Sequence, residues 1–169
     1  LSTVIIASGP LGKPPRQYLR EHEATVDAAV TKYLKNNRIT VADNRRYQAA
    51  LSAAHRQLGD PYDPGTDRID MNVQQQVLGA VFAQLREQQP SVDAVIFTEL
   101  VNRDVYFSSG LKRSARWDGV SRSPLMQGPG QGVPVDFNWA QPFDAVSLGI
   151  YVFTVQGKRV FMSAGGLSL

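Results

Sequence analysis

The chain has 169 residues, 43% of them hydrophobic and 20% charged, with 18 Lys and Arg against 15 Asp and Glu. This composition is typical of one folded domain over residues 1–169 and excludes a disordered chain, and the net charge of +3 disfavours nucleic-acid binding. The absence of Cys excludes disulfides, thiolate nucleophiles and Cys-based zinc sites. No apolar run approaches the roughly 18 residues that a membrane-spanning helix needs.

The chain is predicted to begin with a strand and a helix. Residues 3–7, TVIIA, are a β-branched run that the following Gly and Pro residues end. From Leu19 to Leu34 apolar residues recur at helical spacing, which predicts an amphipathic helix. Asn36-Asn37 is expected to adopt the left-handed backbone that ends it.

A short strand and two more helices follow. Residues 38–42, RITVA, are expected to be a strand, and Asp43 or Asn44 an N-cap of the second helix, which ends at Gly59. Two Pro and one Gly make residues 60–67, DPYDPGTD, a predicted loop.

A third helix is predicted from its cap to its terminating proline. Asp70 is expected to cap this helix and Pro90 to end it. Residues 93–101, DAVIFTELV, are then a nearly continuous apolar run, which is typical of a strand buried on both faces.

The second half is predicted to be β-structure around one long connection. Strand-like pieces lie at 105–107 and 115–117, and residues 121–145 show no period and are expected to be an irregular loop. Residues 146–164 alternate about a Gly-containing turn and predict a hairpin, with Gly165-Gly166 as a bulge or stop. The fold class is therefore α/β: a mixed sheet with helices packed on one face, β-α-β-α-α-β followed by an antiparallel meander.

Cations and aromatic side chains gather in the second half, and four of them are candidate partner-binding residues. Arg and Trp dominate interface hot spots, which points to Arg113, Arg116, Trp117 and Trp139. The alternative is that the cations are a solvated strand face while the aromatic residues pin the loop to the domain. A third interpretation, nucleic-acid binding through these strands, is open but disfavoured by the chain's charge.

Motifs of known catalytic chemistry do not occur in the sequence. It contains no G-x-S-x-G elbow, no H-E-x-x-H and no phosphate loop, so we expect neither an enzyme nor a cofactor or metal. The alternative function is a small-molecule-binding protein or hydrolase with a pocket under the 121–145 loop. There Asp118, Asp136 and His55 are the residues that would have to converge.

Three quoted segments carry a resemblance to a known group of proteins. NNRITVADN (36–44), running into YQAALSAAHRQLG (47–59), and the closing DAVSLGIYVFTVQGKRVFMSAGGL (144–167) resemble bacterial envelope domains. That group comprises the TolB amino-terminal domain, the curli-secretion lipoproteins and the outer-membrane lipoproteins that activate peptidoglycan synthases.

The resemblance implies a periplasmic accessory lipoprotein domain, anchored to the outer membrane by a lipid carried before Leu1. We expect it to act by protein–protein interaction in envelope assembly or secretion. Its partner would be another envelope protein or a second copy of itself, with no nucleic acid and no membrane contact except the anchor. No functional residues transfer, because the group shares no catalytic motif.

Overall fold

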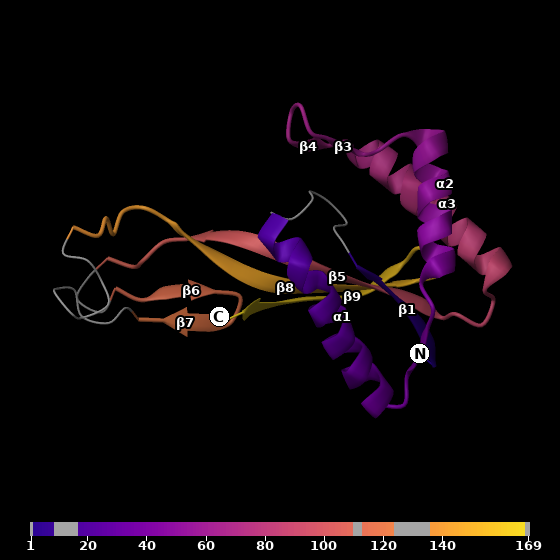
Figure 1. Ribbon diagram of the computed structural model, residues 1–169, viewed down its shortest axis with the longest axis horizontal. Helices are drawn as coiled ribbons and strands as arrows, with labels where there is room; N and C mark the ends of the chain where they lie inside the picture. Colours follow the sequence, from indigo (N-terminus) through magenta and orange to yellow (C-terminus); the bar gives the residue numbers. More distant parts are fainter. Residues whose placement is uncertain (1, 9–16, 110–112, 124–135, 168–169) are drawn as a thin grey trace. The chain divides into compact units, whose positions relative to one another are not determined.

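The computed structural model describes residues 2–8, 17–109, 113–123 and 136–167 (Figure 1). Its elements in chain order are β1 (Thr3–Ser8), α1 (Gln17–Asn36), β2 (Thr40–Ala42), α2 (Arg45–Leu58), β3 (Tyr62–Asp63), β4 (Arg68–Ile69), α3 (Met71–Gln88), β5 (Ala94–Val105), β6 (Ala115–Trp117), β7 (Val120–Arg122), β8 (Phe143–Thr154) and β9 (Arg159–Leu167). No helix in these ranges is long and apolar enough to cross a membrane.

The chain forms two compact units. Leu1–Leu100 with Gly149–Ser163 make the first, named here the α/β unit, and Val101–Leu148 with Ala164–Leu169 make the second, the β unit. The chain passes from one unit to the other within β5, β8 and β9. The single-domain expectation stays a prediction, because compactness alone does not show whether either unit folds by itself.

The predicted mixed sheet with helices packed on it is confirmed. The strand order is β2-β1-β5-β8-β9, and both β2 and β5 run parallel to β1, which lies between them. The register pairs Val4 of β1 with Val41 of β2 on one side and with Ala94 of β5 on the other. A tight turn joins β8 to β9, in which the Thr154 N–H donates to the Lys158 carbonyl at 2.9 Å.

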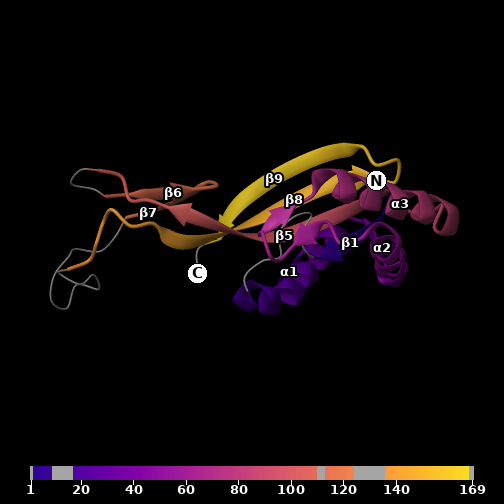
Figure 2. The same ribbon diagram turned by 90° about the horizontal axis from the view of Figure 1, so that it is seen from above.

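Helices cover both faces of this sheet, so the expectation that they share one face is wrong. Successive residues of β1 belong to different cores: Val4 packs with Leu34 of α1, whereas Ile5 packs with Tyr47 of α2 and Val77 of α3. The physical reason is that β1 lies between β2 and β5 in the sheet. The crossover from β1 to β2 and the crossover back from β2 to β5 run in opposite directions, and right-handed connections then place their helices on opposite faces. Figure 2 shows α1 and the α2–α3 pair as separate groups along the strands.

Helix ends and short loops differ from the sequence prediction in two places. Arg38, not the preceding Asn pair, takes the left-handed backbone after α1 (φ 61°), and the Ile39 N–H closes the helix on the Leu34 carbonyl at 3.0 Å. The predicted loop at 60–67 includes the short strand β3, which pairs with β4. The Asp70 cap is confirmed, since its carboxylate accepts the N–H groups of both Asn72 and Val73 at 2.9 and 3.1 Å.

The β unit contains a hairpin that the sequence prediction missed. β6 and β7 pair antiparallel about Asp118 and Gly119, whose φ values of 37° and 86° suit the tight two-residue turn of a hairpin. The predicted irregular loop at 121–145 is therefore wrong at its ends, because β7 extends to Arg122 and β8 begins at Phe143. Residues 124–135 of that loop lie outside the described residues.

Gly166 does not end its strand, because β9 continues to Leu167. Its N–H donates to the Asp118 carbonyl at 2.7 Å, and a side chain at this position would collide with Trp117 and Val120. This glycine is therefore explained by close approach to the β6–β7 hairpin.

Candidate functional site

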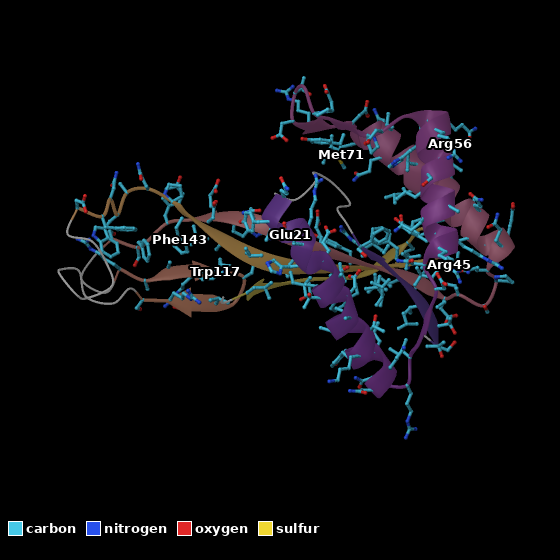
Figure 3. All side chains as sticks on the ribbon, in the orientation of Figure 1. Glu21, Arg45, Arg56, Met71, Trp117 and Phe143 are labelled. Carbon is cyan, nitrogen blue, oxygen red and sulfur yellow. The ribbon has the colours of Figure 1, made fainter. Side chains whose placement is uncertain are left out.

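The four predicted contact residues all lie in the β unit, but one of them is buried. Trp117 is only 8% exposed and belongs to an apolar core with Val105, Ala115 and Ala145. Its indole N–H donates to the Val146 carbonyl at 3.2 Å. This placement agrees with the interpretation that aromatic residues pack the domain, and it leaves Trp117 little surface for a partner. Trp117 and its neighbour in that core, Phe143, are labelled in Figure 3.

Arg113 and Trp139 are brought together. The Arg113 guanidinium carbon lies 4.3 Å from the centre of a Trp139 ring, a distance typical of a cation–π contact. Both side chains are half-buried, and the Trp139 ring also meets Phe107 and Phe137 edge-on at 5.1 and 4.8 Å. The pair thus presents a cation and an indole on an aromatic base, with part of each accessible to solvent.

Arg116 is the exposed member of the predicted set. It lies on β6 opposite Ser121, between the buried residues Ala115 and Trp117. An open cleft of about 390 Å³ follows this strand and turn, lined by residues 116–121. The alternation of β6 explains this exposure, because successive side chains of a strand point to opposite faces.

Asp118 reduces the positive charge beside this surface. Its carboxylate accepts a hydrogen bond from Arg103 Nε at 2.9 Å. The Ser147 hydroxyl, and then Arg103, hold the pKa of the Asp118 carboxyl below its ordinary value. Within the predicted acidic and His set, Asp118 and exposed Asp136 belong to the β unit and His55 to α2 of the α/β unit.

A polar group beside the parallel strands β1 and β5, where Ser8 pairs with Thr98, was not predicted. Asp27 of α1 accepts a hydrogen bond from the Ser8 hydroxyl, and another from the Thr98 hydroxyl at 2.6 Å. Thr98 is 4% exposed, so this carboxylate satisfies a buried donor and fixes α1 to β1 and β5. Burial, and then Asp27, raise the pKa of Glu23 one turn earlier in α1. No sequence motif links these positions, because they meet only when β1 and β5 pair.

An open cleft of about 600 Å³ lies at the amino end of α2. Arg45 and Arg46 line it, but Arg45 Nε is paired with Asp43 at 2.6 Å and Arg46 donates to the Gln88 carbonyl at 2.5 Å. Both cations are therefore already engaged within the chain. The cleft could hold a small ligand, although its two arginines would first have to exchange these partners.

An exposed apolar segment on the final strand of the sheet was not predicted from the sequence. β9 ends the sheet order, and among the described residues it pairs within that sheet with β8 alone. Val160, Phe161 and Met162 on this strand are 50%, 51% and 59% exposed. The alternating pattern of residues 146–164 predicted the hairpin. That pattern alone does not reveal that the second strand of the hairpin lies at the edge of the sheet.

Among the residues that the structure describes, no group of three or more His, Asp or Glu side chains is placed to hold a metal ion. Comparison of the chain with protein-family models, with curated proteins and with solved structures gives no significant match.

Proposed function

We propose that this chain is an accessory domain of the bacterial envelope, periplasmic and held at the outer membrane by a lipid anchor, which acts by binding another envelope protein. Its role is in assembly or secretion and not in catalysis. The order of its elements and the three quoted segments support the envelope assignment. The observation that carries the binding role is the accessible pair formed by Arg113 and Trp139, together with the exposed Arg116, on the β unit.

These residues suit a protein partner for physical reasons. A guanidinium supplies several directed donors, and a half-buried indole supplies a large rigid contact at little cost in conformational entropy. Because the Trp139 ring rests on Phe107 and Phe137, it is already held in place before a partner arrives. Preorganisation of this kind reduces the entropy lost on association.

The test is capture of an envelope partner by the purified chain, with Arg116→Glu as the variant and Arg56→Glu as the matched control. Arg56 is also an exposed arginine and lies on α2 of the other unit (Figure 3). Arg116→Glu should lower the yield of a specific cross-linked partner several-fold while leaving the melting temperature unchanged, and Arg56→Glu should do neither. Equal capture by the two variants would remove this surface from the proposal.

A second candidate, binding of a small molecule, is favoured by the cleft beside Arg45 and Arg46. An anionic ligand that replaces the Asp43 carboxylate at Arg45 and the Gln88 carbonyl at Arg46 would be favoured there, since the dipole of α2 adds positive potential at its amino end. A ligand screen by thermal shift tests it: a hit whose stabilisation is lost in Arg46→Gln but retained in Arg116→Glu would favour this function over protein binding.

A further inference from the structure

We propose that the exposed edge at Arg159–Ser163 of β9 binds the same edge of a second copy of this chain, antiparallel, about a two-fold axis beside Phe161. This interface lies in the α/β unit and is independent of the Arg113–Trp139 surface. It would extend the sheet of one copy into the sheet of the other.

The first step concerns the open edge itself. An unprotected edge strand is a template for another strand, and proteins usually blunt such edges by making them short or by adding charge or Pro. At the opposite edge of the sheet, β2 is only three residues long. Within β9, the five residues Arg159–Ser163 that belong to the α/β unit contain no Pro and carry Arg159 as their one charge, so this part of the edge lacks the usual protection among the described residues.

The second step concerns the direction of the backbone groups. The Lys158 carbonyl accepts the Thr154 N–H, so the backbone of residue 158 faces β8. Residues of an antiparallel strand direct their N–H and C=O groups alternately to the two sides. Arg159, Phe161 and Ser163 should therefore present theirs to the open edge, and a two-fold axis beside Phe161 would pair these same residues.

The third step concerns the side chains, and it decides which occupant fits. The segment reads Arg-Val-Phe-Met-Ser, an apolar triplet with a polar residue on each side. In the register centred on Phe161, Phe161 meets its own copy, Val160 meets Met162, and Arg159 meets Ser163. Every exposed apolar side chain of the triplet then has an apolar partner across the strands, and such pairs stabilise a sheet.

Other arrangements of two copies match less well. A parallel pairing in register would put the two Arg159 side chains next to each other, and like charges in that position are destabilising. An antiparallel pairing centred on Ser163 would place Phe161 opposite Gly165 and Val160 opposite Gly166, where no side chain is available for contact. The near-symmetry of the segment about Phe161 is thus the reason for choosing a second copy over an unrelated strand.

Sedimentation of the whole chain over about 1 µM to 1 mM should show a monomer–dimer equilibrium, because an interface of this size is small. Phe161→Lys places two charges together at the axis and should raise the dimer dissociation constant by about tenfold or more. Tyr33→Lys is the matched control, since Tyr33 is an aromatic residue of the same unit that is 69% exposed on α1. It should leave the equilibrium unchanged, and circular dichroism should confirm that both variants are folded.

Cysteine cross-linking tests the register, because the chain has no Cys of its own. In Phe161→Cys the two thiols lie directly opposite and should form a disulfide-linked dimer on mild oxidation. In Ser163→Cys the two thiols would be four residues apart, about 14 Å along the strands, and should not cross-link. Comparison of these two variants distinguishes cross-linking in the proposed register from cross-linking by random collision.

Three results would overturn the proposal. The first is that the chain is a monomer at every concentration. If Phe161→Lys then also loses capture of a different protein, the edge would be assigned to that protein and not to a second copy. The second is equal weakening by Phe161→Lys and Tyr33→Lys. The third is cross-linking of Ser163→Cys as fast as that of Phe161→Cys.

Discussion

A single methyl group added at Gly166 is expected to destabilise the β unit, whereas the same change at Gly165 is not. An alanine Cβ at Gly166 would lie 2.6 Å from Cγ2 of Val120 and 2.8 Å from both Nε1 and the carbonyl oxygen of Trp117. At Gly165 the corresponding Cβ meets no atom within 4 Å. The two neighbouring glycines therefore form a matched pair in which only one position is crowded.

The size of the effect depends on how little the atoms around Gly166 can move. One of the colliding atoms is a backbone oxygen, and the Gly166 N–H is bonded to the Asp118 carbonyl, so the strand and the hairpin would have to move apart. Overpacking of this kind costs about 1–3 kcal/mol. For a urea dependence of about 2 kcal/mol per molar, the midpoint should fall by roughly 0.5–1.5 M.

Tryptophan fluorescence is a suitable assay, because the chain's tryptophans are Trp117 and Trp139 and both belong to the β unit. Urea unfolding should give a lower midpoint for Gly166→Ala and, for Gly165→Ala, one equal to or slightly above that of the wild type, since alanine loses less entropy than glycine in a strand. Equal midpoints for the two variants would refute the close approach of β9 to the β6–β7 hairpin.

Three further predictions concern single interactions. The backbone N–H groups of Thr3 and Ser2 hold the pKa of Asp93 at about 2. The Asp93 carboxylate therefore stabilises the fold at pH values above its ordinary pKa, and this contribution is lost as the pH falls toward 2. The difference in melting temperature between the wild type and Asp93→Asn should shrink between about pH 4 and pH 2. Asp70→Ala removes the cap of α3 and should lower the free energy of unfolding by about 0.5–2 kcal/mol in urea titrations, and an unchanged value would contradict the cap. Trp117→Phe leaves the Val146 carbonyl without its indole donor and should cost about 1–3 kcal/mol by the same measurement, with the remaining tryptophan as reporter; a loss no larger than that of an exposed substitution would argue against the bond.

The elements that local spacing determines could be predicted from the sequence. The three helices, the buried strand after Pro90 and the closing hairpin all follow from periodicity over a few turns or strand residues. Asp70 was also predictable, because a cap bonds to residues only two or three positions away. The β6–β7 hairpin carries a local signal too, the Asp118-Gly119 pair, which was outweighed by the apparent irregularity of the residues that follow.

Features that depend on distant pairing could not be predicted in this way. The helices lie on both faces because β1 lies between β2 and β5, and the spacing of residues within one segment does not indicate the strand order. Trp117 and Trp139 are the same residue type, yet Trp117 is 8% exposed whereas Trp139 is half-buried under a guanidinium. The Asp27 group requires β1, α1 and β5 to meet, which the sequence pattern does not indicate.

The order of the two units along the chain constrains how the protein can change. Most of the β unit is one continuous stretch, Val101–Leu148, so recombination at two points in the gene could replace it as a cassette and preserve the order of every helix. The tail Ala164–Leu169 would remain, with Gly166 shaped to fit against Trp117 and Val120. A replacement for residues 101–148 would therefore have to pack against residues 164–167, which ties the evolution of these two segments together.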